Sequence, residues 1–223
     1  MPSFIIGSVM STHVKSIFPV VLLWADIETF DKDALVEYVY QQMKDDPEGR
    51  MVSNVGGWQS DGNYHEFDNP IRKFLEDAMK KLFDKGIYKE DTRINIIQSW
   101  INVNMKGSFN RSHYHSMCDL SGTFWIKVPK KSGDIKFHNP NGFAESKMMA
   151  NMNPQFREEL GVHWGMDFYP TEGRVCLWPS HLFHDVAPNM SDEDRISVAF
   201  NVNVDGSNSF DEVGGTNWNK GSN

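Results

Sequence analysis

Two histidines stand one residue apart in the segment NRSHYHSMCDL, just before an alternating apolar run that is typical of a strand. Residues two apart in a strand share one face and lie about 6–7 Å apart, so His113 and His115 can converge on one metal ion. The pair alone is a weak signal for a metal site, because surface histidines fall at the same spacing by chance.

A second pair, His181 and His184, lies downstream in the segment LWPSHLFHDVAPN. It follows a predicted strand that ends at Pro179, so these histidines belong to a turn or to the start of the next strand. The pair provides a candidate third metal ligand, and the two segments together favour a metal site more strongly than either does alone.

The segment RISVAFNVNV alternates along its whole length, with an apolar face and a polar face. The polar face carries Arg195, Ser197, Ala199, Asn201 and Asn203. Such a face lies either toward solvent or along a polar cavity. In a cavity, the planar guanidinium of Arg195 is suited to bind a carboxylate through two parallel hydrogen bonds.

Two helices are predicted in the first part of the chain, which must help to position these strands. Apolar residues recur at helical spacing over residues 35–43, after Asp31 or Asp33 as a cap. They recur again over residues 71–83, between an Asn-Pro start and a stop at Gly86. Both apolar stripes require a sheet on which to pack.

From about Thr92 the period changes to two, in short segments broken by Gly, Pro and Asn. The predicted strands lie in RINIIQSWINVNM, TFWIKVP, DIKFHNP, MDFYP, GRVCLWPS and RISVAFNVNV. Helices followed by many antiparallel strands favour a mainly β fold, a jelly roll or similar barrel buttressed on one side by helices.

Residues 53–65, SNVGGWQSDGNYH, are rich in Gly, Asn and Ser and are predicted to form a loop without regular elements. The loop contains Trp58, for which two interpretations stay open. Trp58 forms a lid or wall of a substrate pocket, or it fills the core between the helices and the sheet.

The composition, with 39% hydrophobic and 23% charged residues, is that of an ordinary globular protein. We predict a single domain over residues 1–223, with helical support at about 30–90, a β-core at about 92–204 and a Gly- and Asn-rich tail at 205–223. The formal net charge of −8 disfavours nucleic acid and anionic membranes as partners. An anionic ligand therefore needs a local positive charge.

The longest apolar run, SIFPVVLLWADIETF, is too short and too soon interrupted by acidic residues to span a bilayer. It follows no basic segment with a small-residue cleavage site, as a signal peptide would. Only two cysteines occur, Cys118 and Cys176, which is consistent with a reducing compartment. We therefore expect a cytoplasmic protein.

Taken jointly, the segments SNVGGWQS, HYHSMCDLSGTFWIKVP, FHNP, WPSHLFHDVAPN and RISVAFN resemble the 2-oxoglutarate/Fe(II) oxygenase family found in bacteria and their phages, over about residues 18–203. The resemblance implies a double-stranded β-helix, the cupin-like jelly roll, that holds Fe(II) in a facial triad and uses 2-oxoglutarate and O2. Carried over by position, His113 opens the triad and His184 closes it. Arg195 and Ser197 would hold the distal carboxylate of 2-oxoglutarate.

The chain departs from the family pattern at His115, where most 2-oxoglutarate enzymes have Asp or Glu. We predict His115 as the third metal ligand, with Asp119 open as an alternative and Asp185, beside His184, as a weaker one. Four extended residues span about 13 Å, so Asp119 could act beside His115 only if the chain turned between them. Asn102 is a further candidate for hydrogen bonding to the oxoacid, unless its strand face is solvated.

These residues predict an Fe(II)- and 2-oxoglutarate-dependent dioxygenase, most simply a hydroxylase, that converts 2-oxoglutarate to succinate while it oxidises a small-molecule or protein substrate. Two other classes stay open. One is a cupin-like metalloprotein with three histidine ligands, an isomerase or an oxoacid-independent dioxygenase, which His115 favours. The other is a jelly-roll binding module without activity. The sequence leaves the oligomeric state open.

Overall fold

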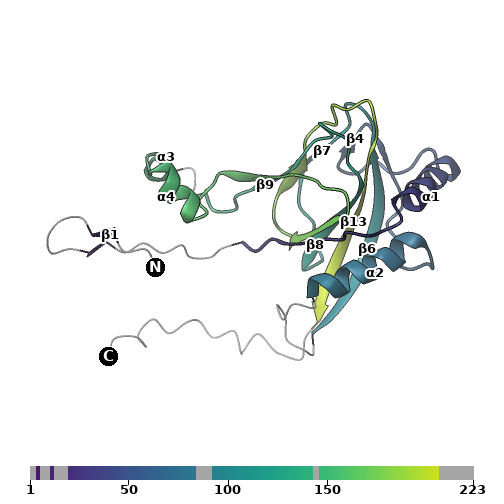
Figure 1. Cartoon of the computed structure of the whole chain (residues 1–223), viewed down its shortest axis with the longest axis horizontal. Coiled ribbons are helices and arrows are strands. Elements are labelled where there is room, and N and C mark those ends of the chain that lie inside the picture. The colour runs from purple at the N-terminus through teal and green to yellow at the C-terminus, as the bar shows by residue number, and fades with distance from the viewer. Residues whose placement is uncertain (1–3, 6–10, 13–19, 84–91, 143–145, 206–223) are drawn as a thin grey trace.

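The computed structural model describes residues 4–5, 11–12, 20–83, 92–142 and 146–205. The described chain forms two antiparallel sheets with two helices outside the larger one (Figure 1). The larger sheet contains, in spatial order, β3 (Leu23–Asp26), β11 (Arg174–Pro179), β8 (Leu120–Lys127), β13 (Arg195–Asp205), β6 (Arg93–Asn104) and β5 (Trp58–Gln59). The smaller sheet contains β10 (Gly165–Phe168), β9 (Ile135–His138), β12 (His184–Val186), β7 (Phe109–His113) and β4 (Asn54–Val55).

The remaining elements are short or lie outside the sheets. They are the strand pair β1 (Phe4–Ile5) and β2 (Ser11–Thr12) and the helices α1 (Lys32–Asp45), α2 (Pro70–Phe83), α3 (Lys147–Ala150) and α4 (Pro154–Glu159). None of the helices in the described part of the chain is long and apolar enough to cross a membrane. The predicted fold class, a β-rich jelly roll supported by helices, is confirmed, and each of the six alternating segments contains a strand.

Both predicted helices form, and a side chain caps the start of each. The Asp31 carboxylate accepts a hydrogen bond from the backbone N–H of Ala34 at 3.1 Å, so Asp31 rather than Asp33 caps α1. The amide oxygen of Asn69 accepts one from the N–H of Arg72 at 3.0 Å at the start of α2. The expected stop at Gly86 lies outside the described residues.

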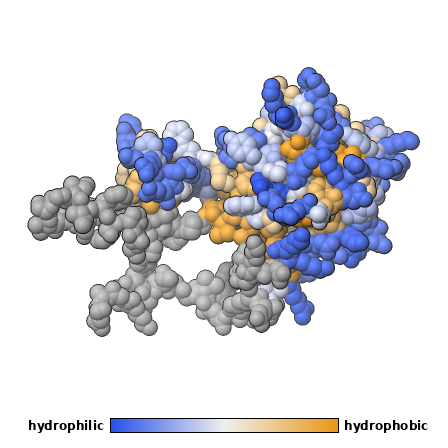
Figure 2. All heavy atoms as spheres, viewed as in Figure 1, coloured by the Kyte–Doolittle hydropathy of each residue, from blue (hydrophilic) through white to orange (hydrophobic). Residues whose placement is uncertain are grey.

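The two helices cover one face of the larger sheet and bury its apolar side chains. Their buried residues are Leu35, Val39, Ile71, Leu75, Ala78, Met79 and Leu82. They form one core with sheet residues such as Phe124, Val198 and Phe200. Hydrophilic residues dominate the side of the molecule on which α1 and α2 lie (Figure 2). Because both helices pack on one face of the larger sheet, its opposite face is free to line a cavity.

The prediction of an irregular loop over residues 53–65 is wrong in part, because the segment contains β4 and β5. The strand β4 pairs with β7 of the smaller sheet, whereas β5 pairs with β6 of the larger one. The crossing between sheets uses Gly57, whose φ is +71° and whose added Cβ would lie 2.7 Å from the carbonyl oxygen of Val103. Trp58 is 4% exposed and belongs to the core, which agrees with the second interpretation.

Replacement of Leu75 by alanine tests how much the packing of α2 supports the sheet. Leu75 is fully buried, so Leu75→Ala is expected to lower the free energy of unfolding by about 2–5 kcal/mol in urea denaturation. Lys73→Ala, on the exposed face of the same helix, should change it by less than about 0.5 kcal/mol. Equal effects of the two substitutions would contradict this packing.

Candidate active site

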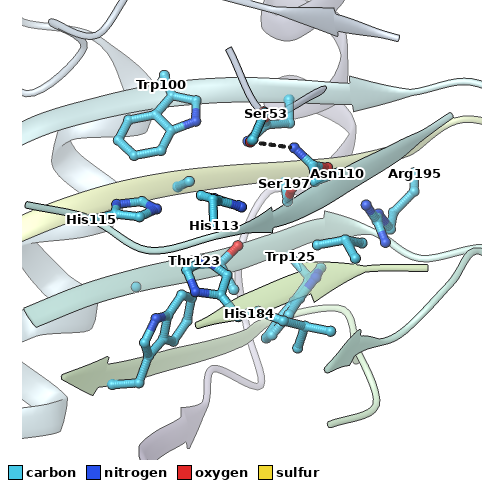
Figure 3. Close-up of a pocket in the computed structure, with 16 residues that line it drawn as sticks. Ser53, Trp100, Asn110, His113, His115, Thr123, Trp125, His184, Arg195 and Ser197 are labelled. Atoms are coloured by element: carbon cyan, nitrogen blue, oxygen red, sulfur yellow. Dashed lines mark hydrogen bonds between the residues drawn. The ribbon is translucent and has the colours of Figure 1, made fainter. Parts of the chain in front are cut away.

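A pocket opens between the two sheets, on the face of the larger sheet opposite the helices (Figure 3). Its wall combines residues of β6, β8, β11 and β13 with residues of β7, β9 and β12. The lining residues are Ser53, Trp100, Asn102, Asn110, His113, His115, Gly122, Thr123, Trp125, Ile135, Trp178, His184, Val186, Arg195, Ser197 and Ala199. The polar face of the RISVAFNVNV segment therefore lines a cavity rather than solvent.

Three histidines converge in this pocket: His113, His115 and His184. His113 ends β7, His184 begins β12, and the two residues are direct partners across the antiparallel pair. His115 lies beyond the end of β7, yet one ligand nitrogen from each residue lies within 4.8 Å of the others. The sequence prediction that both histidines share a strand is therefore wrong for His115, although the rings still converge. His181 is exposed and lies outside this cluster.

Each of the three rings uses its Nδ1 in a hydrogen bond to a carbonyl oxygen. The pairs are His113 with the backbone oxygen of Arg111 at 2.6 Å, His184 with that of Leu182 at 2.9 Å and His115 with the side-chain oxygen of Asn201 at 2.6 Å. A carbonyl oxygen can only accept, so each Nδ1 must carry the hydrogen. The Nε2 lone pair of every ring is therefore available to a metal ion.

The surroundings keep these imidazoles neutral. Burial lowers the pKa of His113, of His115 and, to about 3, of His184, where the neighbouring His113 lowers it further. A metal ion requires the neutral form of histidine, so protons compete weakly for this site near neutral pH. The donor set, three neutral nitrogens on one side of a cavity, fits a divalent transition metal.

The carboxylate alternatives are occupied elsewhere. Asp119 is exposed, and its Oδ2 accepts a hydrogen bond from the backbone N–H of Val204 at 2.8 Å. Asp185, next to His184, lies 2.6 Å from the Nε2 of His138. Among the described residues, neither carboxylate joins the group of side chains that could hold a metal ion.

Arg195 is a buried cation that forms no salt bridge within 4 Å in the described part of the chain, although the carboxylate of Asp134 interacts with it electrostatically. It is 2% exposed, and burial lowers its pKa to about 10. Its Nη1 donates to the backbone oxygens of Ser132 and Gly133 at 3.2 and 3.1 Å, and its Nη2 donates to the side-chain oxygen of Asn104 at 2.9 Å. Its Nε–H has no hydrogen-bond partner. A buried charge of this kind is costly, and an incoming carboxylate would both neutralise it and accept from Nε.

Asn102 and Ser197 lie opposite each other on the neighbouring strands β6 and β13, and both line the pocket. They are 8% and 6% exposed, and the amide oxygen of Asn102 has no hydrogen-bond partner. The structure thus brings all six predicted site residues to one pocket. In Figure 3, Arg195 lies toward the end of the pocket away from His115.

Sequence reasoning missed residues that support these groups. Asn104 shares a strand face with Asn102, as the alternation of the segment indicates, but its hydrogen bond to Arg195 depends on strand pairing that the sequence does not display. Asn201 lies on the polar face of β13, but its contact with His115 depends on pairing that the sequence does not display. The Trp178 ring meets that of His184 at a centroid distance of 5.0 Å, and no motif predicted this contact.

A known protein family matches the part of the chain that contains this site. Residues 98–201 match a family described as "Putative 2OG-Fe(II) oxygenase". The matched range includes all three histidines of the cluster and Arg195. No curated protein sequence matches the chain.

Solved structures share the fold at low sequence identity. The carbocyclase SnoK from nogalamycin biosynthesis, described as non-heme and alpha-ketoglutarate-dependent, is 12% identical over 81% of this chain and 78% of that one, with a TM-score of 0.55. HygX from Streptomyces hygroscopicus, solved with nickel, 2-oxoglutarate and hygromycin B, is 10% identical over 82% of both chains, with a TM-score of 0.54.

An oxidoreductase of the 2OG-Fe(II) oxygenase family from Burkholderia pseudomallei is 17% identical over 60% of this chain, with a TM-score of 0.45. The chain covers 56% of that protein's length. At these identities the similarity to SnoK and HygX shows that this chain has the double-stranded β-helix fold. The chemistry is indicated by the family match. Residues 98–201, which carry the three histidines and Arg195, therefore match the 2OG-Fe(II) oxygenase family, as the sequence motifs predicted.

Proposed function

We propose that the chain is a hydroxylase in which His113, His115 and His184 bind Fe(II), while Arg195, Ser197 and Asn102 bind 2-oxoglutarate. The observation that carries this proposal is the composition of one pocket. Three available imidazole nitrogens lie in the same cavity as a buried guanidinium that forms no salt bridge within 4 Å among the described residues and whose Nε has no hydrogen-bond partner. A ligand with one metal-binding end and one carboxylate end matches both features.

The bound metal and 2-oxoglutarate, together with O2, supply the oxidising chemistry: the oxoacid loses CO2 to give succinate, and one oxygen atom enters a substrate C–H bond. The task of the protein is to hold the reactants in a fixed geometry. The His113 and His184 rings are fixed by the pairing of β7 with β12, and Arg195 is fixed by three hydrogen bonds to the surrounding chain.

At the other end of the oxoacid, Arg195 would donate its Nε–H to the distal carboxylate, and the Ser197 hydroxyl would donate beside it. Asn102 faces Ser197 across the strand pair and offers its amide to the same ligand. These groups are already ordered by the sheet, so little conformational freedom is lost when the oxoacid binds.

Aromatic side chains form much of the remaining wall and limit the access of water. Trp100, Trp125 and Trp178 all line the pocket, and the last two are each 3% exposed. Exclusion of water protects a reactive oxidising centre from unproductive reactions. An entirely polar cavity would not provide this protection.

The charge of the site favours an oxoacid over the alternative of an oxoacid-independent metalloprotein. Three neutral imidazoles leave the charge of a divalent metal uncompensated, whereas 2-oxoglutarate, a dianion, can neutralise the metal at one end and Arg195 at the other. An isomerase or an oxoacid-independent dioxygenase has no evident use for the buried guanidinium.

The substrate belongs to the same proposal: a small molecule or an exposed protein side chain, rather than nucleic acid or a membrane lipid. The acidic net charge of −8 supports this choice. Both cysteines are free thiols, and Cys176 is fully buried, which supports action in a reducing compartment such as the cytoplasm. We also propose that the chain acts as one domain.

Loss of the guanidinium should weaken oxoacid binding without loss of the metal. For Arg195→Met, removal of a charge-assisted contact is expected to raise the Kd for 2-oxoglutarate roughly 10- to 100-fold. The measurement is an anaerobic titration of the Fe(II)-loaded protein that follows the visible charge-transfer band of the chelated oxoacid. Arg174→Met is the matched control, because Arg174 pairs with Asp26 outside the pocket. An unchanged Kd in Arg195→Met would favour the oxoacid-independent alternative.

Metal binding should depend on the buried histidine of the second pair and not on the exposed one. His184→Ala removes one of three ligands and is expected to abolish stoichiometric Fe(II) binding in an anaerobic calorimetric titration of the chelator-treated protein. His181→Ala is expected to bind like the unaltered protein. Equal binding by both variants would rule out His184 as a ligand.

A further inference from the structure

We propose that Asn201 is a positioning residue that holds His115 in its metal-binding orientation, and that its neutral amide keeps the positive charge of the metal centre available to the oxoacid. The inference rests on the proposed function, because it requires His115 to bind the metal. It assigns a role to a residue that lies outside the predicted ligand set.

His115 needs such support more than the other two histidines do. His113 and His184 are residues of paired strands and face each other in register. His115 follows the end of β7, where the backbone is held by one hydrogen bond from its N–H to the oxygen of Ser180 at 2.9 Å. The orientation of its ring must therefore come from side-chain contacts.

Two contacts with residues outside the histidine cluster help to fix this ring. Its Nδ1 donates to the side-chain oxygen of Asn201 at 2.6 Å, across 86 residues of sequence. The indole of Trp100 stacks beside it with a centroid distance of 5.6 Å and an interplanar angle of 29°, and Figure 3 shows the two rings next to each other. The hydrogen bond sets the tautomer and the direction of Nε2, and the stacking restrains the plane of the ring.

Asn201 is itself held in place by its neighbours on both sides. It lies between Gln98 of β6 and Ser121 of β8, which are its direct partners across the strands. Its Nδ2 donates to the side-chain oxygen of Gln98 at 3.0 Å, and its Oδ1 accepts from the hydroxyl of Ser121 at 3.0 Å. Both contacts orient the oxygen of Asn201 as the acceptor for His115, and the residue is only 5% exposed.

An irregularity in the sheet lies at this position. The pairing of β13 with β6 shifts by one residue between Asn201 and Val202. The extra residue, Ile97, belongs to β6, so the alternation of β13 continues through Asn201. Asn201 thus lies on the same strand and the same polar face as Arg195 and Ser197, and β13 carries supports for both ends of the proposed ligand.

The neutral acceptor has a consequence for charge. A carboxylate behind a metal-bound histidine makes the imidazole more basic and adds negative charge next to the metal. An amide orients the ring without adding this charge. Since the other two rings are also supported by neutral carbonyl oxygens, a dianionic oxoacid would meet the full charge of the metal.

Two substitutions at this position should therefore act in opposite directions on the metal. Asn201→Ala removes the acceptor and is expected to weaken Fe(II) binding about 10-fold or more. Asn201→Asp keeps an acceptor of the same size but makes it charged, and this variant is expected to bind Fe(II) at least as tightly as the unaltered protein. The added charge should weaken 2-oxoglutarate binding in Asn201→Asp several-fold.

The experiment titrates Fe(II) anaerobically into the metal-free forms of the unaltered protein, Asn201→Ala, Asn201→Asp and the control Asn203→Ala, by calorimetry. It is followed by 2-oxoglutarate with the charge-transfer band as the readout. Asn203 lies on the same strand outside the pocket, so its variant should match the unaltered protein in both titrations. Thermal unfolding of each metal-free variant separates an effect on the site from an effect on the fold.

Recovery of metal affinity in Asn201→Asp with weakened 2-oxoglutarate binding would support the inference. Unchanged Fe(II) binding in Asn201→Ala would overturn it and leave the proposed function intact. Equal losses of metal affinity and of thermal stability in both variants would also overturn it, since they would indicate a structural role. Failure of the unaltered protein to bind Fe(II) would instead overturn the proposed function, and with it this inference.

Discussion

The register of β13 between β6 and β8 determines where the polar side chains of the pocket lie. Side chains of a strand alternate strictly between faces, so a shift by one residue would move Arg195 and Ser197 into the core and Ile196 and Val198 into the pocket. The core under the helices prevents this shift, because Ile196 and Val198 are fully buried there. Packing on one face of the sheet thus enforces the chemistry on the other.

The strand β13 begins with Arg195, whose buried charge lowers the stability of the fold. An acidic segment precedes Arg195, and in it Asp192 pairs with Lys106 and Glu193 with Lys127. Such exposed pairs contribute little stability individually. They nevertheless connect the segment immediately before Arg195 to the turn after β6 and to the end of β8. The cost of burying the guanidinium is the kind of strain expected at a binding site, where the missing partner is the ligand.

Much of this arrangement could be predicted from local patterns, and the reasons for the exceptions are physical. The alternation of RISVAFNVNV was enough to place Arg195 and Ser197 on one polar face, because alternate residues of a strand share a face whatever the order of the strands in the sheet. The capping of α1 also depends on neighbouring residues only, so the sequence limited the cap to Asp31 or Asp33. By contrast, β4 and β5 form from a glycine-rich segment whose strands exist only because each pairs with a distant partner. The support of His115 by Asn201 depends on a contact between residues 86 apart in the sequence, and a single sequence does not reveal that they lie close together.

The measurement that tests the central claim most directly is a crystal structure of the protein with Fe(II) and 2-oxoglutarate, prepared anaerobically. We expect the metal bound by Nε2 of His113, His115 and His184, and the distal carboxylate of the oxoacid within hydrogen-bond distance of the Arg195 guanidinium. A metal ligated by Asp119 or Asp185, or an oxoacid with its distal carboxylate away from Arg195, would contradict the assignment of the site.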